Sequence, residues 1–183
     1  IVTAVGLGFD FDRSCAAVGE LLPVAGRMER SMTPEGVLVV VDYAHTPDAL
    51  ENALAALQPE TAGLLWVVFG CGGDRDAGKR SEMGRIADSL ADQLVVTNDN
   101  PRSEAPSLIA NHILSGVSAA PCHVELDRGE AIRYAVLGAQ RGDTVLVAGK
   151  GHETYQVIGD RKLDFSDVDC AAQVLREREL AHA

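Results

Sequence analysis

The sequence is short of lysine and of long apolar runs, and each shortage excludes a class of partner. Only three of its 16 basic residues are lysines, and 27 acidic residues bring the formal net charge to −11 at pH 7. A chain this acidic lacks the basic face that nucleic acids and anionic membrane surfaces require. The longest apolar run, around residues 64–71, is well short of the roughly 20 residues that span a membrane. We therefore expect no nucleic-acid partner and no membrane partner.

Cysteine is also sparse, with four residues spread along the chain at positions 15, 71, 122 and 170. They form no CxxC pair and have no neighbouring pair of histidines, which excludes a zinc site and a small disulfide framework. Isolated cysteines of this kind are typical of reduced thiols, so we expect a cytoplasmic protein with no metal site of its own.

The length of 183 residues corresponds to one domain and a piece of another. The stretch Pro23–Gly36 carries two prolines and two glycines and is the best candidate boundary. The chain opens on Ile1 rather than Met and has no signal peptide, so we expect that sequence upstream has been removed. The predicted parts are a tail, residues 1–25, and a domain, residues 26–183.

Short β-branched runs alternate with amphipathic helical stretches along the chain. Predicted strands lie at 37–41, 64–69, 94–97, 123–126, 144–148 and 156–158, and predicted helices at 13–22, 47–57, 80–91, 106–117, 130–140 and 167–180. Strands that are apolar on both faces and joined by helices predict a doubly wound, Rossmann-like α/β domain with a mostly parallel sheet and helices on both faces. The pattern does not give the strand order.

In such sheets ligands bind at the carboxyl ends of the strands, which selects four loops, at 42–47, 70–80, 98–102 and 149–153. Two of the three lysines lie in these loops together with several arginines. An acidic protein that gathers its cations at one edge is expected to bind carboxylates or phosphates there. The alternative is that these are solvated charges of the kind found in any loop.

The second loop contains an apparent phosphate-binding motif. Residues 73–79 fit GxxxxGK, follow a strand and open a helix, but Arg80 stands where Ser or Thr should reach magnesium. Asp74 and Asp76 also place carboxylates where phosphates would lie. The mixture of acids and cations in this loop favours a zwitterionic ligand over a polyphosphate.

The other loops carry groups suited to an amino acid and a nucleotide. Arg102 offers a planar fork for a carboxylate, and Asp99 can accept a hydrogen bond from an ammonium group, although Asp-Asn-Pro is also a common turn. Gly149 allows a ligand close to the backbone, and Glu153 adds a second anion. Asp42, at a strand end, suits a ribose or phosphate.

Five segments in order resemble the MurE-type Mur ligases, over essentially the whole chain: residues 26–29, 42–50 (DYAHTPDAL), 69–80 (FGCGGDRDAGKR), 97–102 (TNDNPR) and 148–153 (AGKGHE). The resemblance implies an ATP- and Mg²⁺-dependent ligase of peptidoglycan synthesis. Such an enzyme activates the carboxylate of UDP-N-acetylmuramoyl-L-alanyl-D-glutamate as an acyl phosphate, which the amine of meso-diaminopimelate attacks.

The resemblance also implies roles for particular residues. The residues that would hold meso-diaminopimelate are Arg75, Asp99, Asn100, Pro101, Arg102, Gly149 and Glu153. Those that would contact the nucleotide are Arg27 and Asp42, with His45 beside them. It implies no catalytic residue and no metal ligand in this chain.

The phosphate loop with its Ser or Thr and the domain that binds the UDP-sugar are absent from the sequence. The resemblance therefore implies that residues 1–25 are the tail of the central ATP-binding domain and that residues 26–183 are the C-terminal amino-acid-binding domain. ATP and Mg²⁺ would be held mainly by the missing N-terminal and central domains, and this chain would be inactive alone. The alternatives are a lysine- or dipeptide-adding relative and a stand-alone α/β module that binds an amino acid or nucleotide.

Overall fold

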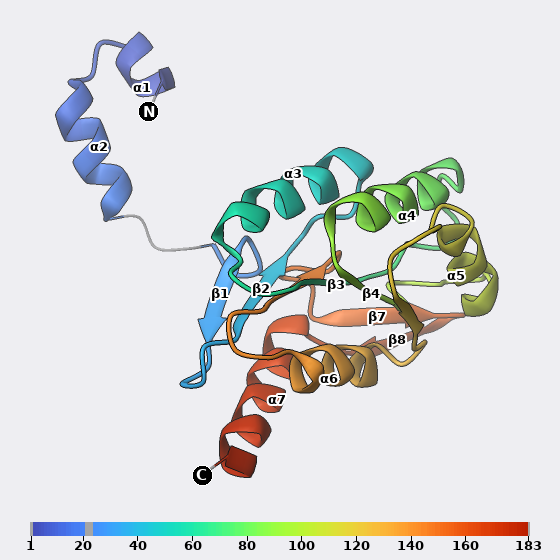
Figure 1. The fold of residues 1–183 in the computed structure, drawn as a ribbon. Coiled ribbons are helices and arrows are strands. Elements are labelled where there is room, and N and C mark those ends of the chain that lie inside the picture. The colour runs from blue at the N-terminus through green and yellow to red at the C-terminus, as the bar shows by residue number, and fades with distance from the viewer. Residues whose placement is uncertain (1, 21–23, 183) are drawn as a thin grey trace.

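The computed structural model describes residues 2–20 and 24–182. Within these residues the main sheet has six strands in the order β1-β2-β6-β3-β4-β5 (Figure 1). Their bounds are β1 Glu29–Met32, β2 Leu38–Asp42, β3 Leu65–Phe69, β4 Gln93–Val96, β5 Cys122–Val124 and β6 Thr144–Ala148. The edge strand β1 is antiparallel to β2, and the other neighbouring pairs are parallel.

Helices cover both faces of this sheet (Figure 1). On one face lie α3 (Pro47–Leu57), which a short 3₁₀ helix η1 (Gln58–Glu60) extends, α4 (Gly78–Leu90) and α5 (Pro106–Leu114). They pack on the strand residues that point to this face. Leu50 of α3, for example, lies in the same apolar cluster as Leu146 of β6.

On the other face lie α6 (Arg128–Gly138) and α7 (Asp167–His182). They pack on the alternate strand residues, so that Ile132 of α6 shares a cluster with Val145 and Val147 of β6. Every residue of β3 and β6 is buried, because these central strands are covered on both sides. The predicted doubly wound α/β fold is confirmed.

The helices α3, α5 and α7 begin where they were predicted, whereas α4 and α6 each begin two residues earlier than predicted. The side chain of Thr46 accepts a hydrogen bond from the amide of Ala49, with Pro47 in the first turn of α3. Two strands were not predicted, β1 and β8 (Arg161–Asp164), the second of which pairs with β7 (Tyr155–Ile158) in a separate antiparallel hairpin. Both unpredicted strands are rich in charged residues and exposed, so they lack the apolar alternation that identifies strands.

The N-terminal helices α1 (Val2–Gly6) and α2 (Phe11–Gly19) lie apart from the sheet (Figure 1). The predicted helix at 13–22 begins two residues earlier than expected, because Asp10 is its cap and accepts a hydrogen bond from the amide of Arg13. Its predicted end at Leu22 and stop at Pro23 lie outside the described residues. None of the helices in residues 2–20 and 24–182 is long and apolar enough to cross a membrane.

Candidate functional site

The four loops selected from the sequence converge at the carboxyl edge of the sheet, around a cavity of about 500 Å³. The cavity is lined by Tyr43, His45, Thr46, Gly72, Arg75, Asp76, Lys79, Asp99, Asn100, Arg102, Gly149, Glu153 and Tyr155. Seven of the ten residues singled out from the sequence are among them. The other three, Arg27, Asp42 and Pro101, lie beside the cavity.

The loops after β3 and β4 contact each other through backbone. The amide of Gly73 donates to the carbonyl of Asn100 at 2.9 Å, and a Cβ at position 73 would overlap the carbonyl oxygen of Pro101. Glycine is needed at position 73 because the backbones of the two loops approach too closely for any side chain. This contact brings the loop that carries Arg75 against the loop that carries Arg102.

Arg75 and Arg102 contribute two guanidinium groups to the cavity wall, which also carries Asp76 and Lys79. Arg102 has a left-handed backbone, with φ of 50°, and its Nη1 donates to the carbonyl of Gly73 at 2.8 Å. Among the described residues, neither the Arg75 side chain nor Nη2 of Arg102 has a hydrogen-bond partner, so these groups remain available to a carboxylate.

The carboxylates of Asp99 and Glu153 on the cavity wall are called the acidic end of the cavity, and a buried lysine contacts both of them. The Nζ atom of Lys150, whose side chain is fully buried, lies 3.1 Å from Oε2 of Glu153, 3.2 Å from Oδ1 of Asn100 and 3.4 Å from Oδ1 of Asp99. The side-chain Nδ2 of Asn100 also donates to Oε2 of Glu153 at 3.1 Å. Lys150 is one of the loop cations evident in the sequence, but it is not among the predicted site residues. The scarcity of lysine was the signal that could have identified it.

The hairpin β7–β8 holds this acidic end in place. Gln156 donates to the carbonyl of Asp99 at 2.7 Å, and the amide of Val157 donates to Oδ1 of Asn100 at 2.9 Å. The amide of Arg102 also donates to the carbonyl of Val157 at 3.1 Å. The 99–102 loop is therefore fixed against the hairpin by these hydrogen bonds, one between backbone groups and two that use a side chain, none of which was predicted from the sequence.

The residues expected to contact a nucleotide form a second cluster beside the cavity. The guanidinium of Arg27 stacks 4.4 Å from the ring centroid of Tyr43, and Asp42 accepts the amide of Met28 at 2.8 Å. The ring of His45 lies 4.5 Å from the Tyr43 ring. Arg27 is exposed, so its charge remains accessible beside the cavity.

A buried ion pair lies beneath both site loops. Nε and Nη2 of Arg128 each donate to the carboxylate of Asp167 at 2.7 Å, and both side chains are fully buried. Arg128 also donates at 3.0 Å to the carbonyls of Asn98 and Ala148, the residues just before Asp99 and Gly149. Burial lowers the pKa of Arg128, but the Asp167 carboxylate outweighs it, and the net shift is upward. Neither residue stood out in the sequence.

The start of α4 differs from a phosphate loop, as the sequence suggested. Asp76 accepts the amide of Gly78 at 2.8 Å, so a carboxylate already lies at the start of the helix. The buried guanidinium of Arg80, in place of a hydroxyl, donates to both carboxylate oxygens of Glu104. These hydrogen bonds hold the pKa of Glu104 at about 2.

Comparison with known proteins places the chain among relatives of one type. Residues 26–151 match the family described as Mur ligase, glutamate ligase domain. The chain is 51% identical over 177 residues to a UDP-N-acetylmuramoyl-L-alanyl-D-glutamate–2,6-diaminopimelate ligase of Synechococcus elongatus, and 50% identical over 174 residues to the enzyme of that name from Vibrio parahaemolyticus. These alignments cover 96% and 94% of this chain but only 36% and 35% of the relatives. The chain thus spans about a third of their length.

Solved structures agree with the fold. A structure of a UDP-N-acetylmuramoyl-L-alanyl-D-glutamate–2,6-diaminopimelate ligase superimposes with a TM-score of 0.81 at 41% identity, over 97% of this chain and 37% of that one. The MurC ligase of Thermotoga maritima has the same fold with a TM-score of 0.65 at 21% identity, over 100% of this chain and 36% of that one.

Proposed function

Because the chain belongs to the Mur ligase family, we propose that it is the domain that holds meso-diaminopimelate in a ligase of peptidoglycan precursor synthesis. The ligase joins this amino acid to UDP-N-acetylmuramoyl-L-alanyl-D-glutamate in an ATP-dependent reaction. The names of the relatives at 50% and 51% identity support this substrate pair. The remaining two thirds of those relatives would supply the UDP-sugar site and most of the ATP site.

The presence of unpaired guanidinium groups and of carboxylates on the wall of one cavity is the observation that carries this proposal. Diaminopimelate differs from lysine by a second carboxylate, so that its far end is a zwitterion. Arg102 and Arg75 would bind carboxylate, and Asp99 and Glu153, assisted by Asn100, would accept from ammonium. Lysine would leave a guanidinium unpaired, at a cost of about 1–3 kcal/mol for each lost partner. A site of this kind can reject the analogue by roughly 10⁴-fold.

The cluster of Arg27, Asp42 and His45 fits the edge of an ATP site. Its exposed guanidinium suits a phosphate, and the carboxylate of Asp42, which accepts one backbone amide, suits ribose hydroxyls. ATP, when bound, would supply the phosphate that activates the acceptor carboxylate. The residues of this chain would orient the nucleotide and hold the amine of diaminopimelate toward that carboxylate.

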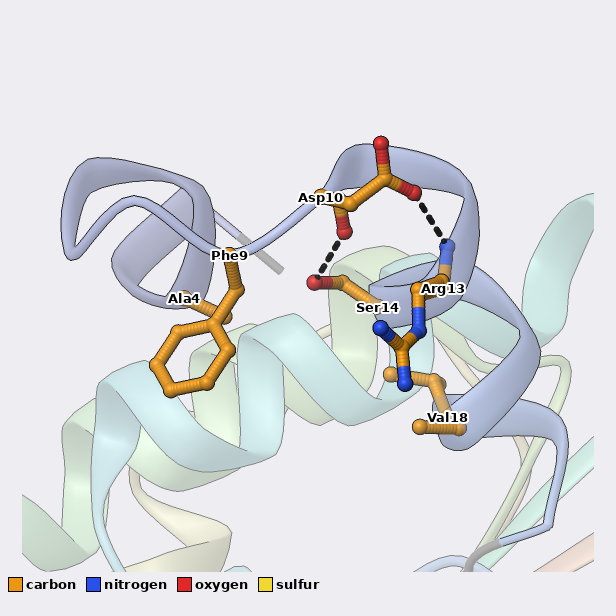
Figure 2. A pocket seen from close by; sticks show the side chains of 7 residues that line it. Ala4, Phe9, Asp10, Arg13, Ser14 and Val18 are labelled. Atoms are coloured by element: carbon orange, nitrogen blue, oxygen red, sulfur yellow. Dashed lines mark hydrogen bonds between the residues drawn. The ribbon is translucent and has the colours of Figure 1, made fainter.

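Residues 1–25 are assigned in this proposal to the end of the preceding, central domain. The helices α1 and α2 and the turn between them line an open pocket of about 530 Å³, and Figure 2 shows Phe9 and Val18 on its wall. Phe9 is 65% exposed and Leu7 is 74% exposed, although such side chains are normally covered. The family match begins at residue 26, which supports a boundary there. Deleting residues 1–23 is expected to leave the thermal unfolding midpoint of the sheet domain unchanged.

The substitution Arg102→Ala tests the function in the ligase expressed from its complete reading frame. The expected result is a large rise in KM for meso-diaminopimelate and a small change in KM for ATP. The exposed Arg141 lies near the opposite edge of the sheet, so Arg141→Ala is the matched control and should change neither constant. Equal rises in KM for meso-diaminopimelate and KM for ATP would contradict the assignment.

Calorimetry separates this function from the alternatives. Titration of the complete ligase with meso-diaminopimelate and with L-lysine should give binding of the first and about 10- to 100-fold weaker binding of the second, the range that the loss of one charged partner provides. Comparable affinities would indicate a lysine-adding relative. Diaminopimelate binding without diaminopimelate-dependent release of ADP would indicate a binding module.

A further inference from the structure

We propose that Lys150 sets the charge of the acidic end of the cavity and thereby the selectivity for a distal ammonium group. It is a positioning residue, since it is buried behind the groups that would touch the ligand. The inference rests on the proposed function, because it concerns the same amino-acid site. Neither the family resemblance nor the residues singled out from the sequence assign a role to this lysine.

The contacts of Lys150 account for all of its hydrogen-bonding capacity. A lysine ammonium has three N–H donors and no acceptor, and Nζ of Lys150 faces three oxygens, one each from Asp99, Asn100 and Glu153. The side chain is fully buried, whereas those of Asp99 and Glu153 are 12% and 20% exposed. The lysine therefore holds two carboxylates at the cavity wall from behind.

Charge counting explains what this arrangement selects. Asp99 and Glu153 contribute two negative charges and Lys150 one positive charge, so the cluster has a net charge of −1. The buried Arg128, which lies behind Asp99, is paired with Asp167 and adds no net charge. One further cation, the ammonium of the ligand, brings the cluster to neutrality. An unpaired charge in a largely buried site is costly, so the remaining negative charge favours a ligand cation there.

Removing Lys150 should therefore harm binding, and removing one carboxylate as well should restore part of it. Lys150→Met leaves a net charge of −2 and two carboxylates that repel each other. Glu153→Gln leaves a net charge of 0 and a lysine that repels the ligand ammonium. The double variant returns to −1, the charge of the native cluster.

The test measures KM for meso-diaminopimelate and for ATP in the complete ligase carrying each variant. Each single variant should raise KM for diaminopimelate by about 10- to 100-fold, the range that one charge-assisted hydrogen bond provides. KM for ATP should change by less than about two-fold, because Lys150 and Glu153 contact Asp99 and Asn100, which are assigned to the amino acid, and not the side chains assigned to the nucleotide. The double variant should have a lower KM for diaminopimelate than either single variant. Arg141→Met, which removes one exposed positive charge elsewhere, should match the native enzyme.

A ligand analogue provides a second readout that a purely structural role would not change. In 2-aminopimelate the distal ammonium is missing, so this ligand suits a neutral cluster. Glu153→Gln should lower the ratio of KM for 2-aminopimelate to KM for diaminopimelate by at least about ten-fold, and adding Lys150→Met should raise it again. Additive effects in the double variant, or an unchanged KM in Lys150→Met, would overturn the inference.

The folding of the variants is itself informative. If Lys150→Met does not fold, the double variant should fold, because it removes the unbalanced carboxylate. Failure of both to fold would overturn the inference. If the native ligase releases no ADP in response to diaminopimelate, the proposed function is wrong. If the native ligase is active and its Lys150 variants have the native KM, only the inference about Lys150 is wrong.

Discussion

Replacing Arg128 by methionine tests whether the buried ion pair supports the site. Arg128 begins α6 and Asp167 begins α7, and both side chains are fully buried. Removing the guanidinium leaves an uncompensated carboxylate in the interior, which costs about 3–5 kcal/mol. For a chain of this length, that loss corresponds to a fall of roughly 6–20 °C in the unfolding midpoint. It is also a large share of a total stability of about 5–15 kcal/mol.

A second ion pair between the same two helices provides the control. Arg133 of α6 and Glu177 of α7 also form a salt bridge, but their side chains are 43% and 36% exposed. Exposed pairs contribute about 0–1 kcal/mol, so Arg133→Met should lower the midpoint by only a few degrees. The two substitutions therefore remove the same type of side chain from the same helix and differ in burial.

The measurement is urea and thermal unfolding of the 183-residue chain, followed by circular dichroism. The double variant Arg128→Met/Asp167→Leu removes both charges and should recover much of the stability lost in Arg128→Met. In the complete ligase, Arg128→Met should also raise KM for diaminopimelate, because its two carbonyl partners precede Asp99 and Gly149. A loss no greater than that of Arg133→Met, or a double variant no more stable than the single one, would refute this reasoning.

Three further predictions concern acid stability, packing and thiol reactivity. Hydrogen bonds from the loop after α5 hold the pKa of Asp88 at about 2, so its contribution to stability is present above about 3.8 and is lost as the pH falls to about 2. The urea midpoint of Asp88→Asn should therefore lie below that of the native protein at neutral pH and converge with it near pH 2. Gly73→Ala should destabilise the chain by about 1–3 kcal/mol, because the new methyl group overlaps the Pro101 carbonyl, and a calorimetric loss below the error would contradict this packing. Burial raises the pKa of Cys71 to about 12, so mass spectrometry after iodoacetamide treatment at pH 8 should find the exposed Cys122 modified and Cys71 unmodified until urea is added.

The position of the candidate site was predictable because it depends on local features. Strands apolar on both faces identify a covered parallel sheet, and the carboxyl edge of such a sheet is where ligands bind. Arg102, Asp99 and Glu153 stand in the loops that follow such strands, and the structure places all three on the wall of one cavity. No knowledge of the strand order was needed for this, because parallel strands end at the same edge.

The supporting residues could not be found in this way, because their roles depend on distant partners. Lys150 meets oxygens 50 and 51 residues earlier in the chain, and Arg128 meets a carboxylate 39 residues later. The residues next to them in the sequence do not distinguish Lys150 and Arg128 from solvated charges on loops and helices. Their burial follows from the spatial order of the strands in the sheet, which brings these distant segments together.

The sequence by itself determined the fold class, the edge that carries the site and the chemical types of group gathered there. It could do so because apolar periodicity and strand ends are properties of neighbouring residues. Only the tertiary structure decided which charges are paired with each other and which remain available to a ligand. Lys150 neutralises one of two carboxylates while the side chains of Arg75 and Arg102 remain available, and this distinction arises from burial and contact across the sheet. The three lysines of the chain thus have different surroundings: Lys150 is buried behind two carboxylates, Lys79 donates to the carbonyl of His45, and Lys162 lies over the ring of Tyr155.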